Sequence, residues 1–289
     1  MHFSIIIPTY NRDKDLFSCL ESLAHYFELD ALVGLGFNAE VIVSDDGRDP
    51  DLRTRLAFSF PWCTYTVGPA RGPAANRNHG AKKACGEWLV FIDDDCLPQL
   101  GLLEAYSEFA DYSDVLEGKT SPSGIKTRAD EECPVNIDGG YLWSCNFAIK
   151  RSLFLSLSGF NEDFPAPAVE DVEFFARIKK CGLDCKFVPN ALVLHPWRYR
   201  KGYAFTVMHA KCVAKFVNLH PEYVSRFSLL SQTTSFLRII KIDLARSISS
   251  GLYRGLPRAI FLDTLSIILT WFYVRKITYK LPLFPSRGI

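Results

Sequence analysis

The stretch that decides the fold is Trp88-Leu89-Val90-Phe91-Ile92-Asp93-Asp94-Asp95, five apolar residues followed at once by three acids. A short continuous apolar run is typical of a strand buried on both faces of a parallel sheet. Three adjacent carboxylates repel one another, so stability does not explain them. A hard divalent cation such as Mg²⁺ or Mn²⁺ removes the conflict, because it takes oxygen ligands and shares them with substrate phosphates. The stretch therefore predicts a metal and phosphate site at a strand end, with a solvated acidic turn as the alternative.

The same order of an apolar run and then polar residues is found at other points of the N-terminal half. Apolar runs alternate with helical patterns, which predicts an α/β fold with a mostly parallel sheet flanked by helices. In open α/β sheets the ligand lies beyond the carboxyl ends of the strands, so the polar residues there are the first candidates for a site. The further predicted strands cover residues 3–7 (ended by Pro8), 40–44 and 64–67, and helices cover residues 16–27 and 73–85.

After residue 110 the pattern is less regular. Residues 119–140 are rich in Pro, Gly, Ser and acids, which predicts a long surface loop. A strand over 145–150, a helix over 172–181 and an extended pair over 186–194 follow. From Tyr203 onward the spacing is helical, so we expect a catalytic domain over residues 1–202 and a basic, amphipathic helical region over 203–289.

Composition and charge exclude several classes of protein. With 48% hydrophobic and 22% charged residues, the chain of 289 residues is a folded protein and not a disordered one. The net charge is +1, which gives no field to attract nucleic acid. Residues 220–289 carry a local charge of +7 and the rest of the chain −6. Nine scattered cysteines without a zinc spacing, and no visible secretory signal, predict free thiols in the cytoplasm.

The C-terminal region contains an apolar stretch over residues 259–274, broken only by Asp263 and bounded by basic residues. A membrane-spanning helix needs about 20 apolar residues without an internal charge, so this stretch is short for a span. Basic and amphipathic segments of this kind lie in the membrane interface. Packing on the domain or on a second copy in a homo-oligomer is the main alternative, and a true span the remaining one.

Three further candidates for chemistry each have a structural alternative. Arg77 lies in a Gly- and Ala-rich segment over 71–80 that could bind a phosphate, or on an exposed helix face. Glu170 and Asp171 begin a predicted helix, where one acid could cap the helix and one could act as general base. His195 follows an apolar run and is either a structural residue or a metal ligand through a ring nitrogen.

Taken together and in this order, these motifs resemble the family 2 glycosyltransferases with the GT-A fold. The resemblance covers roughly residues 3–200, and five motifs in the right order make it specific. They are Ile5-Ile6-Ile7-Pro8-Thr9-Tyr10-Asn11-Arg12, Val41-Ile42-Val43-Ser44-Asp45-Asp46-Gly47, Asn76-Arg77-Asn78-His79-Gly80, Gly86-Glu87 with the run through Asp95, and Gly159-Phe160-Asn161-Glu162 with Glu170-Asp171.

The resemblance implies transfer of a sugar from a nucleoside diphosphate donor, UDP-sugar favoured, with inversion at the anomeric carbon. It implies that Asp171 is the base, with Glu170 as its orienting neighbour, and that Asp95 and His195 bind Mn²⁺ or Mg²⁺. The donor or its nucleotide would be bound by Pro8, Thr9, Tyr10, Arg12, Asp45, Arg77, Asp93 and Asp94. Asn76 departs from the family, which generally has Ala there, so the nucleotide is less firmly indicated.

The expected acceptor is a glycan or a lipid-linked sugar, because the C-terminal region is cationic and apolar. The protein would then act in bacterial surface polysaccharide synthesis, at the inner face of the cell membrane through peripheral contact. One alternative is a non-catalytic membrane-surface adaptor that retains the fold, against which the acids at 93, 95 and 171 argue. Another is a nucleotidyltransferase, but the glycine-rich phosphate loop after the first strand is absent from the sequence.

Overall fold

The computed structural model describes residues 1–27, 36–164 and 166–278 of the chain. The chain divides into two compact units: the first is Met1–Gly124 with Cys133–Pro196, and the second is Ile125–Glu132 with Trp197–Ile289. Residues 125–132, which the sequence places in the N-terminal domain, thus group with the second unit. The last part of the expected C-terminal region, residues 279–289, lies outside the described residues.

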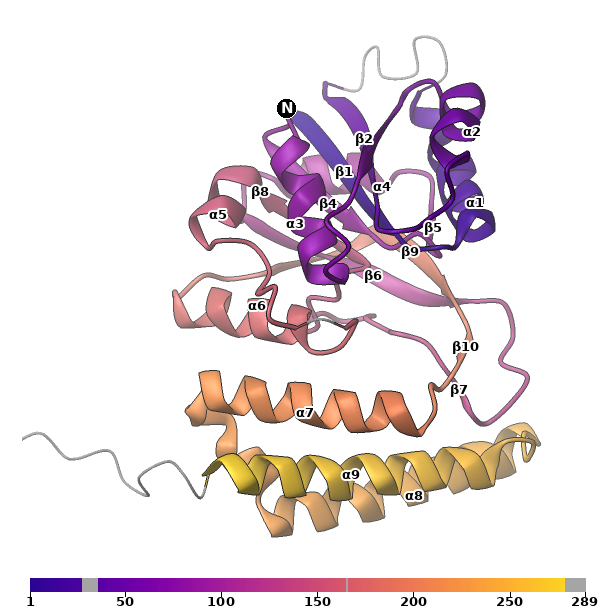
Figure 1. Cartoon of the computed structure of the whole chain (residues 1–289), viewed down its shortest axis with the longest axis vertical. Helices are drawn as coiled ribbons and strands as arrows, with labels where there is room; N and C mark the ends of the chain where they lie inside the picture. The colour runs from indigo at the N-terminus through magenta and orange to yellow at the C-terminus, as the bar shows by residue number, and fades with distance from the viewer. Residues whose placement is uncertain (28–35, 165, 279–289) are drawn as a thin grey trace, which may run out of the picture. The chain divides into compact units, whose positions relative to one another are not determined.

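The first unit is built on an eight-stranded sheet with the order β3-β2-β1-β4-β8-β6-β9-β5 (Figure 1). The pairs β1–β2, β1–β4 and β2–β3 are all parallel, so the carboxyl ends of these four strands lie at one edge of the sheet. β8 runs antiparallel to both β4 and β6, and β6 and β9 are again parallel. The expected mostly parallel sheet is confirmed. The strands are β1 (His2–Thr9), β2 (Asn38–Asp45), β3 (Cys63–Val67), β4 (Trp88–Ile92), β5 (Leu97–Pro98), β6 (Val115–Ser123), β8 (Asn146–Lys150) and β9 (Lys186–Pro196).

Helices cover both faces of the sheet and form two hydrophobic clusters. Because successive strand side chains point to opposite faces, Ile5 and Ile7 pack with α1, α2 and α4, while Ile6 packs with α3, α5 and α6. Figure 1 shows α5 to the left of the strands and α1 and α2 to the right. The helices are α1 (Asp13–Leu23), α2 (Leu52–Ser59), α3 (Pro73–Lys83), α4 (Leu102–Phe109), α5 (Arg151–Ser156) and α6 (Glu170–Lys180), with a 3₁₀ turn η1 (Ala24–Tyr26).

Two predictions about strand ends are wrong, and both involve a proline. β1 continues through Pro8 to Thr9, and β6 continues through Pro122, so residues 119–123 are strand and not loop. β4 pairs with β1 only as far as Ile6, and β8 pairs with β6 only at residues 115–117. Each proline therefore lies where its strand has one ladder partner in the sheet, which is where a missing N–H is tolerated.

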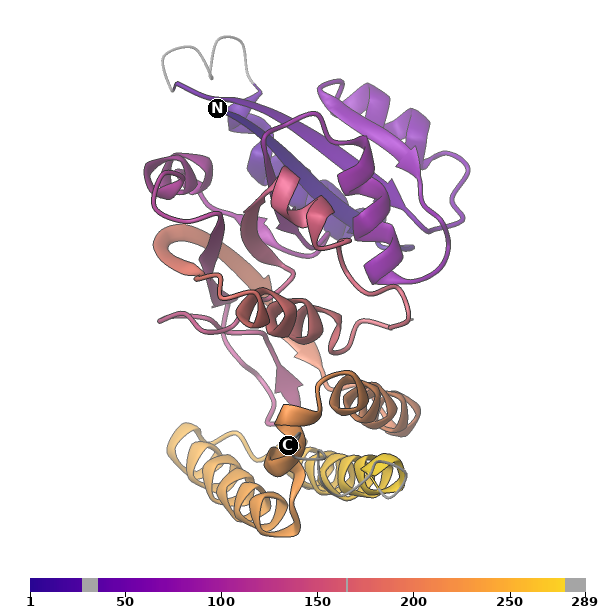
Figure 2. The same cartoon turned by 90° about the vertical axis from the view of Figure 1, so that its left-hand side faces the viewer.

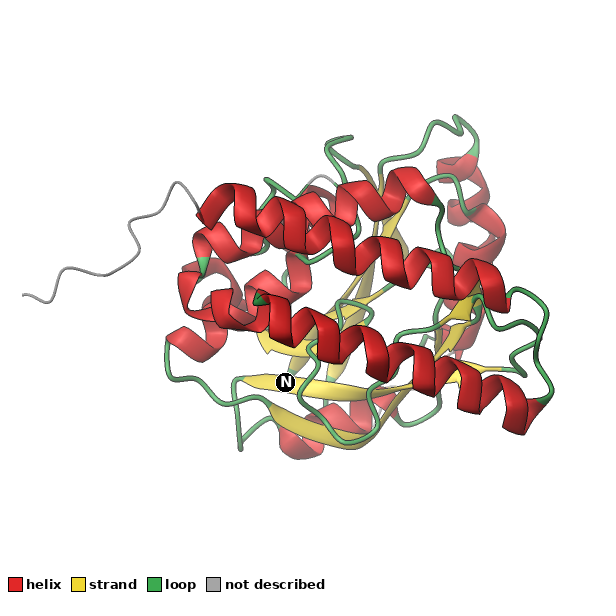
Figure 3. Ribbon diagram, turned by 90° about the horizontal axis from the view of Figure 1, so that it is seen from below, coloured by secondary structure: helices red, strands yellow, loops and turns green. Residues whose placement is uncertain are grey.

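The second unit is mainly helical, as expected from Tyr203 onward. α9 packs against both α7 and α8; Figure 2 views these helices nearly end-on, and Figure 3 shows them from the side. A short antiparallel pair of strands completes the unit. Its elements are β7 (Glu131–Glu132), β10 (Arg198–Tyr199), α7 (Tyr203–Leu219), a 3₁₀ helix η2 (Pro221–Phe227), α8 (Leu229–Ser250) and α9 (Leu256–Thr278).

Two acids of the second unit, Asp130 and Asp263, form ion pairs with arginines of the same unit. Asp263, the acid inside the apolar stretch, pairs with Arg200. Asp130 is almost completely buried and pairs with Arg128 at 2.8 Å and with Arg258 at 2.9 Å. A buried charge is tolerated when a fixed partner of opposite sign replaces water. None of the helices in the described part of the chain combines the length and the apolar content that crossing a bilayer requires.

Candidate active site

Polar side chains converge where the parallel strands end. Thr9 ends β1, Asp45 ends β2 and Asp93 follows β4. The Oγ1 of Thr9 donates a hydrogen bond to Asp94 Oδ2 at 2.7 Å, which joins the ends of β1 and β4 directly. The carboxyl edge predicted from the order of the strands therefore exists as a set of contacting side chains.

Arg12 neutralises two of the three consecutive acids. Its guanidinium lies 2.8 Å from Asp94 Oδ1 and 2.8 Å from Asp95 Oδ2. Asp94 is fully buried, and burial raises its pKa to about 7 against the opposing effect of the Arg12 charge. The structure thus places Asp94 inside the fold, where it ties together Thr9 and Arg12, while Asp95 lies at the edge of the site.

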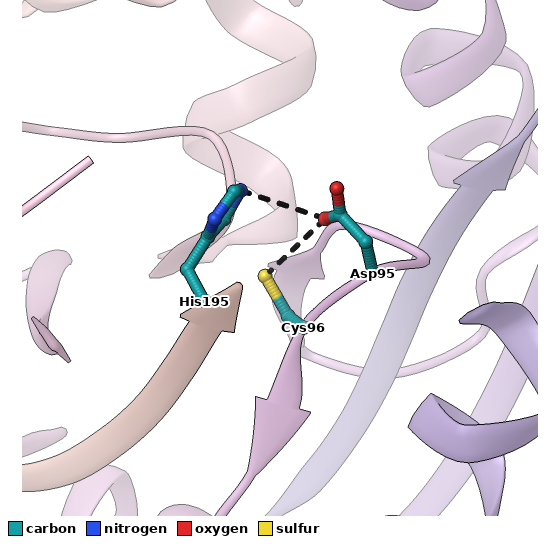
Figure 4. A group of neighbouring side chains, drawn as sticks. All are labelled: Asp95, Cys96 and His195. Atoms are coloured by element: carbon teal, nitrogen blue, oxygen red, sulfur yellow. Dashed lines mark hydrogen bonds and ion pairs between the residues drawn. The ribbon is translucent and has the colours of Figure 1, made fainter. Parts of the chain in front are cut away.

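His195, at the end of β9, faces Asp95 (Figure 4). Its Nε2 is 3.5 Å from Asp95 Oδ1, and its Nδ1 is 2.8 Å from the carbonyl oxygen of Pro196. Since a carbonyl oxygen only accepts, Nδ1 is the donor, and in the neutral ring Nε2 presents a lone pair to the carboxylate. Two acceptors at this distance need a proton or a cation between them. A histidine held by a backbone carbonyl is the usual form of a metal-binding imidazole.

Cys96 is a third neighbour of this pair that the sequence did not indicate. Its Sγ is 3.9 Å from Asp95 Oδ1, and the possible ligand atoms of Asp95, Cys96 and His195 lie within 4.8 Å of one another. Burial and the adjacent Cys145 raise the pKa of the Cys96 thiol, which keeps it protonated. An oxygen and an imidazole nitrogen fit Mn²⁺, so Asp95 and His195 form the pair of ligands that suits the implied ion.

Arg77, from α3, bridges two other predicted residues. Only 3% of its surface is exposed; its Nη2 lies 2.6 Å from Asp93 Oδ1 and its Nη1 3.0 Å from Glu170 Oε1. Burial alone would raise the pKa of Asp93, but the charge and hydrogen bond of Arg77 outweigh it and lower that pKa. The bridge brings the beginning of α6 beside the end of β4.

Glu170 and Asp171 form the first turn of α6. The N–H of Val172 donates to Asp171 Oδ1 at 2.8 Å, and the N–H of Ser144 donates to Oδ2 at 3.5 Å. Burial, together with the charge of Asp171, raises the pKa of Glu170 to about 7, and burial also raises the pKa of Asp171. Two coupled acids with raised pKa values at one helix start are what a base that works near neutral pH requires.

On the side of β2, the carboxylate of Asp45 is buried and already bonded. Its Oδ1 accepts from the N–H of Gly47 at 2.6 Å, and its Oδ2 accepts from the hydroxyl of Tyr65 at 3.0 Å. Asn76 donates to the carbonyl oxygens of Ser44 at 2.9 Å and Thr9 at 3.2 Å. The amide of Asn76 therefore links the ends of β1 and β2 by hydrogen bonds. The sequence shows only that Asn replaces the usual Ala at this position and does not indicate this role.

The remaining predicted residues of this region are at the end of β1. Pro8 is buried in the strand, whereas Tyr10 is one of the exposed large aromatic side chains of the chain. The structure thus brings together two groups: Thr9, Arg12, Asp94, Asp95 and His195 in one, and Arg77, Asp93, Glu170 and Asp171 in the other. Adjacent residues Asp93 and Asp94 join them.

Comparison with known proteins gives these residues a context. Residues 4–116 match the model of the family "Glycosyl transferase family 2". An uncharacterized glycosyltransferase of Haemophilus influenzae is 36% identical over 194 residues, which are 61% of this chain and 61% of that protein. The GalNAc(5)-diNAcBac-PP-undecaprenol beta-1,3-glucosyltransferase of Campylobacter jejuni is 31% identical over 32% of this chain and 29% of its own length. The chain spans less than two thirds of the length of these relatives.

Two solved structures share the fold. A mannosyltransferase from Pyrobaculum calidifontis in complex with GDP-Man and Mn²⁺ has a TM-score of 0.60, 17% identity, and covers 94% of this chain and 86% of its own. Residues 1–349 of TarS from Staphylococcus aureus in complex with UDP-GlcNAc has a TM-score of 0.54, 19% identity, and covers 98% and 93%. At this identity the likeness shows the fold.

The backbone immediately before the two acids is strained, which yields a prediction. Val169 has φ 75°, and a β-branched residue rarely adopts this left-handed conformation. Val169→Ala removes side chain but keeps the strain, whereas Val169→Gly removes both. We expect the glycine variant to be the more stable of the two by about 1 kcal/mol, measured as the free energy of unfolding in urea.

Val172, which is exposed in α6, provides the matched control. There the order should reverse, because glycine inside a helix is about 1 kcal/mol less stable than alanine. The same order at both positions would contradict the assignment of strain to Val169.

Proposed function

We propose that this chain, whose residues 4–116 match the model of glycosyl transferase family 2 and which has the GT-A fold, transfers a sugar from a nucleoside diphosphate donor to an acceptor hydroxyl with inversion. The observation that carries the proposal is the bridge of Arg77 between Asp93 and Glu170, because it brings the acids after β4 beside the acids of α6. An inverting transferase needs this arrangement: a donor site and a base within reach of one reacting carbon.

The donor would lie along the carboxyl ends of β1, β2 and β4. Asp95 and His195 would hold the divalent ion, Mn²⁺ or Mg²⁺, which supplies charge neutralisation for the departing diphosphate when bound. Asp93, kept ionised by Arg77, would bind the ribose or the donor sugar. Pro8, Thr9, Tyr10 and Asp45 would line the nucleotide pocket. The mannosyltransferase complex with GDP-Man and Mn²⁺ and the TarS complex with UDP-GlcNAc support a nucleotide-sugar donor, and the latter supports UDP-sugar.

The base would be Asp171. Its carboxylate is oriented by the N–H groups of Val172 and Ser144, and its neighbour Glu170 is fixed by Arg77. As the acceptor hydroxyl attacks the anomeric carbon from the face opposite the diphosphate, Asp171 would take its proton, which gives inversion in a single displacement. Asp94 and Arg12 would keep the loop after β4 in place. Intact acids at all these positions favour an enzyme over a non-catalytic adaptor.

The second unit supports a lipid-linked acceptor. Exposed apolar side chains follow helical spacing in α9, at Phe261, Ile268 and Phe272. A mainly apolar groove of about 370 Å³ lies between α8 and α9, lined by Phe236, Ile267, Ile268, Trp271, Gln232, Thr233 and Thr264. With the +7 charge of residues 220–289, these faces suit peripheral contact with an anionic membrane. The Campylobacter relative is named for an undecaprenol-linked acceptor, which supports a lipid-linked acceptor here; a role in surface polysaccharide synthesis at the inner membrane face would follow from such an acceptor.

The role of the base is tested with Asp171→Asn. The amide keeps the shape of the carboxylate but cannot take a proton, so we expect transfer from UDP-sugar to fall by about 10²- to 10⁴-fold. Thermal stabilisation by UDP-sugar with Mn²⁺ should remain, because donor binding does not use Asp171. Asp138→Asn, at an exposed position of the first unit, is the control. Near-normal turnover in Asp171→Asn would remove it as the base.

The pH dependence tests the coupling of the two acids. Since burial raises the pKa of Asp171, the acidic limb of kcat/KM, where this base becomes protonated, should lie at a higher pH than the ordinary pKa of an aspartate. Glu170→Gln removes the negative neighbour, which lowers the pKa of Asp171 and moves the acidic limb to lower pH. Glu108→Gln, exposed on α4, should leave the limb in place. An acidic limb of Glu170→Gln that stays or moves upward would contradict the coupling.

Membrane contact is tested by sedimentation with vesicles of phosphatidylglycerol. The triple variant Phe261→Ser, Ile268→Ser and Phe272→Ser removes the apolar row of α9, and we expect binding to fall by at least about tenfold, because each buried apolar side chain contributes about 1.5–3 kcal/mol. Salt should weaken binding of the unaltered protein. The control is Leu100→Ser with Tyr112→Ser, two residues of the first unit whose side chains are more exposed than those of the α9 row. Equal loss in both variants would refute a specific role of α9.

A further inference from the structure

Two aromatic side chains in the first unit form a flat surface that the reaction described above does not use. The rings of Tyr141 and Trp143 are stacked with an interplanar angle of 7° and centroids 5.5 Å apart. Tyr141 is 54% exposed, whereas Trp143 packs against the hydrophobic core on one side. Tyr141 is therefore the ring exposed to solvent, and Trp143 packs between it and the core.

The segment that carries the pair is held by buried polar groups. Glu117 of β6 is 3% exposed and accepts hydrogen bonds from the N–H groups of Gly140 at 2.7 Å and Tyr141 at 3.2 Å. Asn136 donates to the carbonyl oxygen of Tyr141 at 3.0 Å. Burying a carboxylate costs free energy unless hydrogen bonds replace its contacts with water. The N–H groups of the loop supply these bonds to Glu117, so the loop is held in one conformation. Such preorganisation is typical of a ligand-binding surface.

Residues next to the pair form hydrogen bonds with the proposed base and with the backbone of a proposed metal ligand. On one side, the residue after Trp143 is Ser144, whose N–H donates to Asp171 Oδ2. On the other side, the indole Nε1 of Trp143 donates to the carbonyl oxygen of Val135 at 3.1 Å, and nearby Cys133 donates from Sγ to the carbonyl oxygen of His195 at 3.4 Å. The aromatic pair is thus connected through its neighbours to both parts of the proposed site.

The order of the strands favours the acceptor, and not the donor, as the ligand of this aromatic surface. The candidate nucleotide residues end β1 and β2, whereas Tyr141 and Trp143 precede β8 and are held by β6, on the opposite side of β4. On the basis of the proposed function, we propose that Tyr141 and Trp143 form the platform on which a pyranose ring of the acceptor lies. The apolar C–H face of a pyranose matches an exposed aromatic ring, and its hydroxyls remain at the rim for polar contacts.

Direct binding tests the platform without knowledge of the natural acceptor. The probes are the methyl pyranosides of glucose, galactose and N-acetylglucosamine, observed by saturation-transfer NMR on the full chain. We expect the ring protons of at least one pyranoside to receive saturation, and Tyr141→Ala to weaken its binding by about tenfold, in the range of aromatic stacking. Tyr141→Phe and Trp143→Phe keep flat rings and should retain most of the binding.

Tyr112→Ala is the matched control, because Tyr112 is 77% exposed in the same unit and also packs on a neighbouring ring, that of Phe109. It should bind the pyranosides as the unaltered protein does. Equal binding by Tyr141→Ala and the unaltered protein, an equal loss in Tyr112→Ala, or saturation of the methyl aglycone alone would each overturn the platform.

The result can be separated from that of the proposed function. Hydrolysis of UDP-sugar by the unaltered protein with Mn²⁺ tests the function without any acceptor. If hydrolysis occurs and Tyr141→Ala binds pyranosides normally, the platform is wrong and the function stands. If no nucleotide sugar is hydrolysed while Tyr141→Ala loses pyranoside binding, the platform stands and the function fails. With a competent acceptor, Tyr141→Ala should raise the acceptor KM about tenfold more than the donor KM.

Discussion

The site depends on one buried cation, the guanidinium of Arg77. It is removed from water and receives in exchange the carboxylates of Asp93 and Glu170, which come from parts of the chain 77 residues apart. Removing one partner of a buried ion pair costs about 3–5 kcal/mol, since the other charge is left without water or a counter-ion. Breaking the contact between the end of β4 and the beginning of α6 would therefore destabilise the fold. Because Asp171 lies in the first turn of α6, the same contact fixes its position.

This bridge also sets the protonation of the acids. Arg77 makes direct ion pairs with Asp93 and Glu170, but burial and the charge of Asp171 dominate at Glu170. The pKa of Asp93 is consequently lowered, while those of Glu170 and Asp171 are raised. A permanently ionised acid suits the binding of a polar donor, and an acid that titrates near neutral pH suits proton transfer. The carboxylates on the two sides of Arg77 thus differ, because its charge outweighs burial at Asp93 but not at Glu170.

The sequence was sufficient to predict where the acids lie but not how they are bonded. The apolar run before Asp93 marks a buried strand, and the strand order then places Thr9, Asp45 and Asp93 at one edge. Whether Arg77 points inward could not be predicted, because helical spacing alone allows an exposed or a buried position. The contacts of Cys96 and Ser144 were not predictable either. Cys96 resembles an ordinary core residue, and Ser144 acts through its backbone N–H, a group that every residue except proline has. The strand ends at Pro8 and Pro122 were predicted wrongly, because a proline disrupts a strand less where the strand has one neighbour than where it has two.

The bonding of the buried acids differs from one residue to the next. Asp94, like Asp130 of the second unit, is buried and has fixed partners on both carboxylate oxygens, so its charge or proton is accounted for within the chain. Asp95 differs in its neighbours: its Oδ2 pairs with Arg12, and its Oδ1 faces both the Nε2 of His195 at 3.5 Å and the Sγ of Cys96 at 3.9 Å. Under the proposed function, Asp95 and His195 would hold the divalent ion, a role for which a carboxylate oxygen beside an imidazole nitrogen is suited.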